Sequence, residues 1–261
     1  MNNFGTACSH GLAILYLLTV ASVGLSATNS YHWELLPISS YEEFTQGIHA
    51  AEGEEHPKSI ARCPANPDYL YLAIDVVGNW RSTNGGMSWI KCTDEGLYVQ
   101  SMQSLNVDPV NPEIALAVAA PGSGRSNVFG QFSGVYRTED AGESWECVLA
   151  EYVPYVHERA QRLDRKLVAP RPTAPGETHA RVWYAAIDTQ GIFVSFDGGR
   201  TWSPYDTQNI EKVYYTVSVV FDEVTGEDVL YVGSASGLHR YTKSGGDVAR
   251  THVAAVGLVG A

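Results

Sequence analysis

The sequence predicts an all-β protein built from about four copies of one strand-and-hairpin unit. Three observations predict this fold class: a short pattern that occurs three times at nearly equal spacing, an alternating apolar run before each copy, and few segments with helical periodicity. The tryptophans that end the pattern, Trp89, Trp145 and Trp202, lie 56 and 57 residues apart. A fixed period of this size indicates one supersecondary unit repeated along the chain.

Each copy of the pattern, at 82–89, 138–145 and 195–202, is typical of a tight hairpin. A hydroxyl residue comes first, Asp or Asn follows two positions later, then glycine, and Trp ends the copy. The Asp or Asn can accept hydrogen bonds from turn amides, the glycine can adopt positive φ, and the Trp ring can cover the corner. We therefore interpret twelve residues as structural: Ser82, Asn84, Gly86, Trp89, Thr138, Asp140, Gly142, Trp145, Ser195, Asp197, Gly199 and Trp202.

Alternating apolar runs precede the three hairpins, at 69–75, 114–119 and 182–188. Period-two alternation between turn signals predicts strand, hairpin, strand. A fourth, decayed copy covers 229–241 and has Ser244 and two glycines where its hairpin should be. Each repeat unit of about 50 residues should contain about four strands, which predicts the blades of a β-propeller.

The repeated pattern resembles the Asp-box, or BNR, repeat of the propellers in sialidases, sortilin-type receptors, xyloglucan hydrolases and a photosystem assembly factor. The resemblance covers about 59–246. Propellers of these families usually have more blades than the four units counted here, so the resemblance implies an incomplete or open propeller. A four-bladed closure and closure by assembly with a second chain remain alternatives.

We expect four divisions of the chain: a signal peptide at 1–27, a lead-in at 28–58, the Asp-box repeats at 59–246 and an irregular tail at 247–261. The apolar stretch 11–25 is too short for a membrane span, which needs about 20 residues, and the small residues Ser26 and Ala27 follow it. Because the first ten residues contain no Lys or Arg, an uncleaved anchor or a misassigned start is the alternative. These features predict a secreted, periplasmic or extracellular protein.

Charge and cysteine usage exclude several classes of function. The net charge of −12 disfavours nucleic acids and anionic membranes as partners. The chain has no Cys-x-x-Cys or His-Glu-x-x-His motif, so we expect neither a metal site nor a cofactor. Three cysteines lie after the signal, and two alternatives stay open: a disulfide between Cys63 and Cys92, or three buried thiols with Cys147.

Two aspartates are the candidate catalytic residues. When the copies are aligned on the glycine before the aromatic residue, Asp75, Asp188 and Ser234 occupy one position at the end of the alternating strand. Such residues would point toward the mouth of the channel, and glycoside hydrolysis requires two carboxyl groups facing one cleft. The alternative is that each aspartate bonds turn amides, as is ordinary at strand ends.

The segment 72–81 is similar to the Asp-Val-Gly-Gly-x-Tyr-Arg stretch of the xyloglucan-hydrolase family. The resemblance implies that Asp75 is a catalytic base, whereas Val77 replaces the first glycine of the pair and the partner acid of that family belongs to a second propeller. Trp80, Tyr152 and Tyr155 are candidate substrate-binding platforms, because a flat ring can stack on a sugar. Arg81, Arg137 and Arg240 share one repeat position and are interpreted as scaffold residues, which disfavours sialic acid as the substrate.

The hypothesis from sequence is an exported Asp-box β-propeller that acts on or binds neutral polysaccharide in the manner of a glycoside hydrolase. The alternative is a non-catalytic propeller scaffold for protein–protein binding or assembly. Fold does not decide between them. The expected partners are thus a polysaccharide or a protein, with association with further propeller blades as a third possibility.

Overall fold

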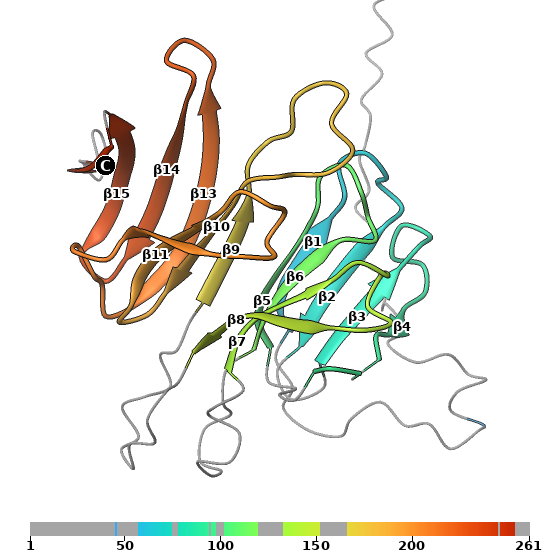
Figure 1. The fold of residues 1–261 in the computed structure, drawn as a ribbon. Helices are drawn as coiled ribbons and strands as arrows, with labels where there is room; N and C mark the ends of the chain where they lie inside the picture. The colour runs from blue at the N-terminus through green and yellow to red at the C-terminus, as the bar shows by residue number, and fades with distance from the viewer. Residues whose placement is uncertain are drawn as a thin grey trace, which may run out of the picture. The chain divides into compact units, whose positions relative to one another are not determined.

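The computed structural model describes residue 45 and residues 57–74, 78–93, 95–97, 102–119, 133–151, 166–244 and 246–253. The strands in this part of the chain form four four-stranded antiparallel sheets, each made of strands consecutive in sequence (Figure 1). This arrangement confirms the all-β fold class and the four repeat units, because a meander of four strands is the blade of a propeller. None of the described residues forms a helix long and apolar enough to cross a membrane.

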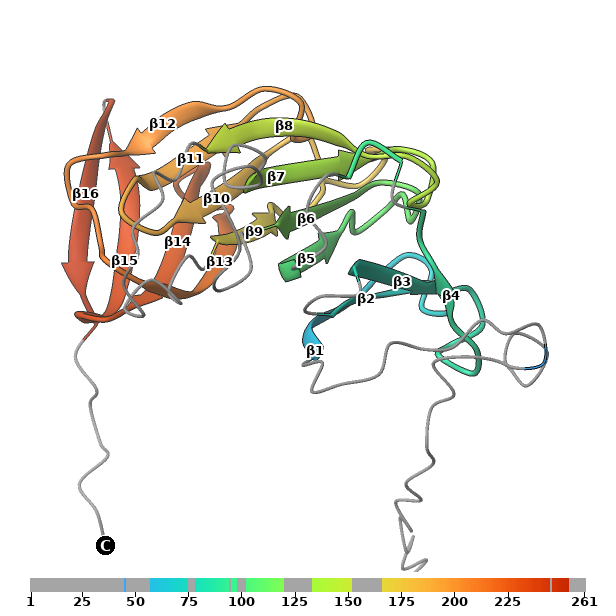
Figure 2. The same cartoon turned by 90° about the horizontal axis from the view of Figure 1, so that it is seen from below.

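The first two sheets have the following strands: β1 (Pro57–Arg62), β2 (Leu70–Ile74), β3 (Gly78–Ser82) and β4 (Ile90–Lys91), then β5 (Met102–Val107), β6 (Ala115–Ala119), β7 (Ser133–Thr138) and β8 (Glu146–Glu151). The other two sheets have these strands: β9 (Lys166–Pro170), β10 (Trp183–Ile187), β11 (Gly191–Ser195) and β12 (Ser203–Asp206), then β13 (Tyr214–Asp222), β14 (Glu227–Ser234), β15 (Gly237–Ser244) and β16 (Asp247–His252). Figure 2 shows the strands of each sheet side by side in chain order.

The last strand corrects the expected irregular tail. Residues 247–252 form β16, which pairs with β15 from Ser244 and Asp247 to His239 and His252. The sequence of β16, Asp-Val-Ala-Arg-Thr-His, shows no period-two alternation and only two adjacent apolar residues, so it lacks the apolar pattern that indicates a strand. Backbone hydrogen bonds to β15, and not an apolar pattern, make this segment a strand.

Strand register fixes which residues of the four sheets are equivalent. The hydroxyl residue that begins each repeated hairpin lies opposite the first residue of the second strand: Leu70 opposite Ser82, Ala115 opposite Thr138, and Trp183 opposite Ser195. The fourth sheet aligns through its third strand, because Ser234 lies opposite Gly237 as Ile187 lies opposite Gly191. Tyr71, Leu116, Tyr184 and Tyr231 therefore occupy one position.

Alternate residues of the second strands pack on opposite sides, so each sheet has a forward face toward the next sheet and a backward face toward the preceding one. Tyr71 and Ala73 of β2 share a core with the odd-numbered residues of β6, whereas Leu116 and Val118 of β6 share another core with Trp183 of β10. A third core joins the third and fourth sheets. The first strands also touch in chain order, β1 with β5, β5 with β9 and β9 with β13.

The three repeated hairpins have the same internal hydrogen bonds. The leading hydroxyl accepts from the amide of the glycine four positions later: Ser82 from Gly86 at 2.9 Å, Thr138 from Gly142 at 2.8 Å, and Ser195 from Gly199 at 2.9 Å. The Asp or Asn side chain accepts from the amide four residues later in each copy: Asn84 from Ser88, Asp140 from Ser144, and Asp197 from Thr201, all at 2.9 Å. These bonds occupy the polar side chains within the turn, in agreement with a structural role.

Cys63, Cys92 and Cys147, the three cysteines in the described part of the chain, form no disulfide, so the structure contradicts the candidate pairing of Cys63 with Cys92. Cys63 and Cys92 are buried in the core between the first and second sheets. Cys92 lies against the second hairpin, where a Cβ added to Gly142 would come within 2.6 Å of its Sγ atom. The thiol thus serves as a small apolar group in the core.

Candidate functional site

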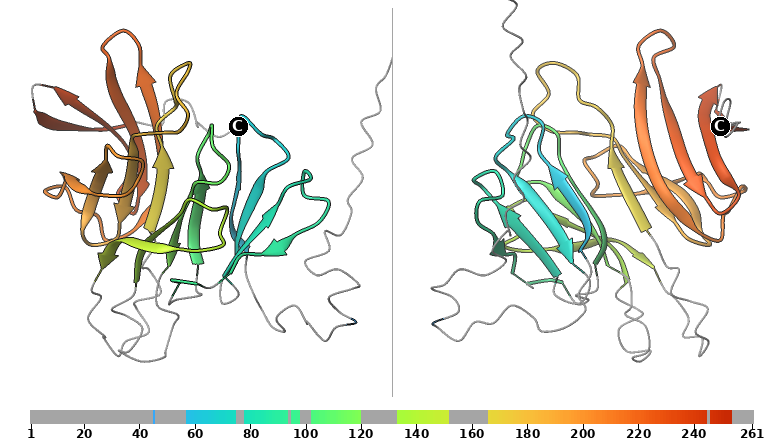
Figure 3. Two further views of the ribbon diagram at one scale, coloured as in Figure 1. Left: turned by 45° about the vertical axis from the view of Figure 1, so that its right-hand side comes forward. Right: turned by 180° about the vertical axis from the view of Figure 1, so that it is seen from behind.

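Each sheet has two ends. We call the end at which the first and second strands are joined the turn end. The repeated hairpins lie at this end too, because the Gly198 amide donates to the Arg181 carbonyl at 2.8 Å and the Gly85 amide donates to the Asp68 carbonyl at 2.9 Å. Figure 3 shows the β9–β10 loop and the β13–β14 hairpin at this same end. The second strands run from there to the opposite end. We call the opposite end the aspartate end, because Asp75 and Asp188 directly follow β2 and β10.

Asp188 connects the third sheet to the fourth. Its side chain is buried, with 2% exposed, and its Oδ1 atom accepts a hydrogen bond from the Tyr214 amide at 2.7 Å. The next residue, Thr189, adopts φ of 63° and donates from its amide to the Glu211 carbonyl at 2.9 Å. A carboxyl group at the mouth of a channel would be partly exposed, whereas Asp188 is buried, because the segment before β13 packs over the end of β10.

The other two residues that the sequence alignment placed with Asp188 are in different situations. Asp75 lies outside the described residues, so the expectation that the two carboxyl groups face one cleft stays a prediction. Ser234 of the fourth sheet is buried, and its hydroxyl lies 3.1 Å from that of Ser236 and donates to the Gly237 carbonyl at 3.3 Å. Ser234 lies opposite Gly237 as Ile187 lies opposite Gly191, so in the structure it is the equivalent of Ile187 and not of Asp188. The sequence alignment of Ser234 with the two aspartates is thus wrong by one residue, because the turn between β14 and β15 is one residue shorter than that between β10 and β11.

A polar cluster at the same end was not predicted from the sequence. The Ser236 hydroxyl donates to Oε1 of Glu211 at 2.5 Å, and Arg250 forms an ion pair with the same carboxylate. The His239 ring lies beside Arg250, with 2.9 Å between Nε2 and Nη2. These residues come from the segment before β13, from the β14–β15 turn and from β15 and β16, so only the pairing of these strands brings them together. No local motif could have indicated the cluster.

The electrostatics of this cluster favour a fixed ion pair. Burial alone would raise the pKa of Glu211, but hydrogen bonds from Ser236 and Arg250 and the charge of Arg250 lower it overall. Burial and the nearby Arg250 charge lower the pKa of His239, so its ring is neutral at pH 7. The Glu211 carboxylate thus remains charged and hydrogen-bonded. This suits a role in holding the segment before β13 in place rather than a role in proton transfer. In the part of the chain that is described, no group of three His, Cys, Asp or Glu residues could hold a metal ion.

Of the three candidate sugar-stacking residues, Trp80, Tyr152 and Tyr155, the structure describes Trp80 alone. Trp80 has 7% of its surface exposed and packs with Ile74 and Trp89, so its ring is not an open stacking surface. Tyr152 and Tyr155 lie outside the described residues. Trp80 sits on the backward face of the first sheet, where alternation along β3 directs it into that small core.

The repeated arginines join one sheet to the next. Nε of Arg137 donates to the carbonyl of Gly198 in the third hairpin at 2.7 Å. Arg81 in the first sheet donates in the same way to the carbonyl of Ala141 in the second hairpin. Both arginines also form an ion pair, Arg81 with Glu143 and Arg137 with Glu139. These contacts agree with the interpretation of the arginines as scaffold residues.

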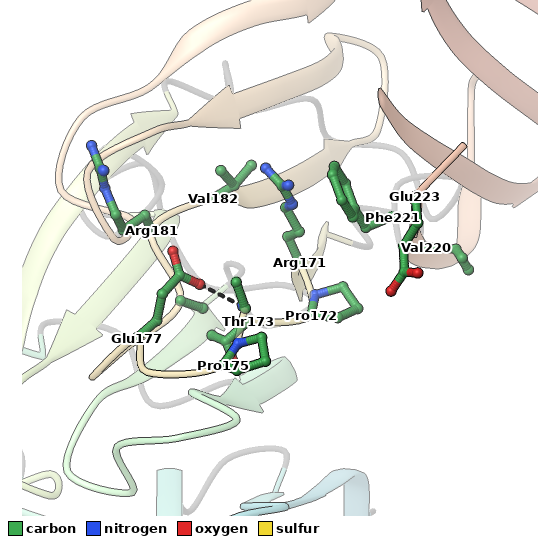
Figure 4. Close-up of a pocket in the computed structure, with 12 residues that line it drawn as sticks. Arg171, Pro172, Thr173, Pro175, Glu177, Arg181, Val182, Val220, Phe221 and Glu223 are labelled. Atoms are coloured by element: carbon green, nitrogen blue, oxygen red, sulfur yellow. Dashed lines mark hydrogen bonds between the residues drawn. The ribbon is translucent and has the colours of Figure 1, made fainter. Parts of the chain in front are cut away.

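A pocket opens at the turn end between the third and fourth sheets (Figure 4). Its cavity volume is about 290 Å³, and its lining comes from the loop between β9 and β10 and from the end of β13. The guanidinium of Arg171 lies over the Phe221 ring at 3.9 Å and pairs with Asp228 at 3.1 Å. Glu177 accepts from the Ala174 amide at 2.7 Å, which closes the loop that forms one wall.

The lining of this pocket combines charged and apolar side chains. Its charged residues are Arg171, Arg181, Glu177 and Glu223, and Arg171 is already paired with Asp228. Phe221 and two prolines add apolar surface. The sequence did not indicate it, because the two walls are about 50 residues apart along the chain and meet only through packing of the sheets.

The chain was compared with known proteins. No family model matches it. It is similar to a protein named Xyloglucanase from Paenibacillus sp., with 27% identity over 207 residues, which are 73% of this chain and 20% of that protein. The chain thus spans about a fifth of the length of this relative.

Similar solved structures include a GH74 enzyme of Niastella koreensis, with a TM-score of 0.49 and 16% identity over 74% of this chain and 30% of that one. A GH74 xyloglucanase from Xanthomonas campestris gives a TM-score of 0.47 and 18% identity, with the same coverage of 74% and 30%. YCF48 from Cyanidioschyzon merolae gives 0.45 and 15%, over 77% of this chain and 57% of that one.

Proposed function

We propose that this chain is part of an exported Asp-box propeller that binds a neutral polysaccharide of the xyloglucan type, as a glycoside hydrolase does. The observation that carries the proposal is the 27% identity to the Paenibacillus protein named Xyloglucanase, which extends over 73% of the chain. The match covers only 20% of that protein, so the name of the relative does not establish an activity for this chain. Hydrolysis by this chain is therefore proposed and not observed.

Charge supports a neutral ligand. The net charge of −12 would repel acidic polysaccharides over distances of about a Debye length. A neutral glucan carries no such penalty and can use hydroxyl hydrogen bonds and ring stacking. The proposal therefore separates xyloglucan from acidic polymers such as polygalacturonate.

We assign different roles to the two candidate aspartates. Asp75 lies in the segment that resembles the xyloglucan-hydrolase stretch, and we propose it as the carboxylate that contacts the sugar and acts as a base toward water. Asp188 is buried and bonded to the Tyr214 amide, which supports a positioning role at the junction of the third and fourth sheets. Glycoside hydrolysis needs a second carboxyl group across the scissile bond, so the role of Asp75 in hydrolysis depends on an acid other than Asp188.

Affinity gel electrophoresis with xyloglucan in the gel tests the binding, with galactomannan and polygalacturonate gels as controls. We expect retardation by xyloglucan alone, and release of reducing ends if the chain also hydrolyses the polymer. Asp75→Asn should abolish any release of reducing ends while the circular dichroism spectrum and melting temperature stay those of the parent. Asp188→Asn should instead lower the melting temperature, because the Tyr214 amide would lose a charged acceptor.

Equal mobility of the parent protein in all the gels would contradict the proposed ligand. Retardation that survives Asp75→Ala but is lost in Phe221→Ala would move the binding site to the pocket at the turn end. Binding of a protein by the unretarded chain would favour the scaffold alternative.

Export is a separate part of the proposal, supported by the apolar stretch 11–25 and the small residues after it. Amino-terminal sequencing of protein recovered outside the cytoplasm should give a start near Ala27. Protein found only inside the cells and still beginning at Met1 would contradict export, whereas a Met1 start outside the cytoplasm would contradict the cleavage alone.

A further inference from the structure

The outer faces of the first and fourth sheets carry the same contact groups as the internal junctions, in the described part of the chain. At each internal junction, a forward face presents a tyrosine or leucine, an apolar residue and, in two of three cases, an arginine to the backward face of the next sheet. The forward face of the fourth sheet and the backward face of the first have the corresponding residues. At two positions of these outer faces, an apolar residue is exposed where the equivalent residue of an internal face is buried.

The backward face of the first sheet exposes an apolar residue that is buried in the other sheets. Ile60, Leu105 and Val168 lie at the same register of the first strand, opposite Leu72, Ala117 and Ala185. Leu105 is 3% exposed and Val168 is 5% exposed, because a preceding sheet covers them, whereas Ile60 is 60% exposed. An isoleucine at this exposure leaves uncovered an apolar surface whose burial would be favourable.

The forward face of the fourth sheet has the complementary exposure. Ile192 and Leu238 each follow the glycine that begins the third strand. Ile192 is fully buried against the fourth sheet, whereas Leu238 is 40% exposed. The same structural position thus changes from core to surface where the described sheets end.

The arginine position adds a polar contact. Arg81, Arg137 and Arg240 lie at the same register, opposite Tyr71, Leu116 and Tyr231. The first two donate to the carbonyls of Ala141 and Gly198, which occupy the same place in the following hairpin. The residue at this place in the first hairpin is Gly85, so its carbonyl is the matching acceptor for Arg240.

A tyrosine contact repeats in the same way. The Tyr71 hydroxyl donates to the Pro112 carbonyl in the next sheet at 2.8 Å. Tyr231 occupies the position of Tyr71, and Pro67 occupies that of Pro112, three residues before the second strand of its sheet. The carbonyl of Pro67 accepts from Arg62 and has a second lone pair available for a hydroxyl.

From these matches we propose that two copies of this chain associate head to tail, with the forward face of the fourth sheet of one copy on the backward face of the first sheet of the other. Arg240 bonds the Gly85 carbonyl, Tyr231 bonds the Pro67 carbonyl, and Leu238 and Ile60 are buried in the new core. Two such junctions would join eight sheets, within the range of about four to eight blades in closed propellers. The inference is independent of the proposed polysaccharide ligand.

Size-exclusion chromatography with light scattering tests the association on the full chain. We expect a dimer for the parent protein and monomers for Arg240→Glu and Leu238→Lys, with dimer affinity weakened about tenfold or more. Lys212→Glu is the matched control, because it makes the same change in charge at an exposed residue of the linker before β13 and should leave the dimer intact. Circular dichroism and melting temperature establish that each variant is folded.

A mixing experiment tests the head-to-tail geometry. Leu238→Lys in one chain and Ile60→Glu in a second chain should each give monomers alone, since both junctions of either dimer place a charge on an apolar residue. Their mixture should form dimers, because one junction then pairs lysine with glutamate and the other is the parent junction. A monomeric parent protein, or a parent dimer that persists in Arg240→Glu and Leu238→Lys, would overturn the proposal.

Discussion

The junction between the second and third sheets differs from that between the third and fourth. The former uses the repeated hairpin: Arg137 bonds the Gly198 carbonyl, and Gly199 lies so close to Leu116 that an added Cβ would come within 2.7 Å of its Cδ2 atom. In the latter, Val194 stands at the arginine position, and Ser244 lies opposite Asp247 where a repeated hairpin would be.

Other polar groups hold the second of these junctions. The Tyr184 hydroxyl donates to Oδ2 of Asp228 at 2.8 Å, Arg171 pairs with Asp228 at 3.1 Å, and Asp188 accepts from the Tyr214 amide. Both junctions retain an apolar core. The difference indicates that the arginine and the hairpin act as a pair, because both are absent from the same junction.

The largest effect is expected at a hairpin tryptophan. Trp145 is buried in the core between the first and second sheets, so Trp145→Ala should lower the free energy of unfolding by about 3–5 kcal/mol. Trp202 is only half-buried in the next core, so Trp202→Ala should lower the free energy of unfolding clearly less than Trp145→Ala does. Urea denaturation of the two variants measures this, and equal losses would show that the two hairpins are packed alike.

An intermediate effect is expected for the arginines. Arg137→Met keeps the apolar stem but removes the hydrogen bond to the Gly198 carbonyl, which should cost about 2 kcal/mol in unfolding free energy. Arg81→Met should cost less, because 17% of the Arg81 side chain is exposed and only 4% of the Arg137 side chain. Urea denaturation at low salt compares them. If Arg137→Met unfolds like the parent protein, the arginine does not stabilise the junction and its pairing with the hairpin has no energetic basis.

The smallest effect is expected in the pH dependence of the third hairpin. Burial alone would raise the pKa of Asp197, but hydrogen bonds from Thr201, Ser195 and the Arg200 amide lower it to about 2. Since the unfolded value is about 3.9, Asp197 contributes stability above that pH, and the contribution is lost as pH falls toward the folded pKa.

Asp197→Asn should therefore reduce stability at pH 7 and flatten the acid limb of stability against pH. The first hairpin already has Asn84 at this position, with the same hydrogen bond to the residue four positions later, so asparagine fits the turn. Thermal unfolding from pH 7 to pH 2 measures the slope, and an unchanged acid limb in the variant would mean that Asp197 does not titrate in this range.

The repeated hairpins were predictable because their hydrogen bonds join residues two to four positions apart. Ser195, Asp197 and Gly199 bond one another within one turn, so the local pattern contains the whole interaction. The fold class followed for the same reason, since alternation along a strand reports which of its two faces is buried. Strand β16 was missed because its pairing partner, and not its own pattern, makes it a strand.

The candidate site could be predicted only in part. Sequence alignment of the repeats placed Asp188 correctly at the end of the second strand. Its burial could not be predicted, because it depends on Tyr214, which is 26 residues away and belongs to the next sheet. The cluster of Glu211, Ser236 and Arg250 is likewise formed by three separate segments.

The sequence by itself thus determined the repeat, its hairpins, the alternation of strand faces and the acidic charge, since each rests on neighbouring residues or on composition. Only the tertiary structure decided that Asp188 is buried, how the arginines reach the next hairpin, and where the pocket beside Phe221 opens. The physical reason is that hydrogen bonds and desolvation between sheets depend on distances that the packing of the whole chain sets.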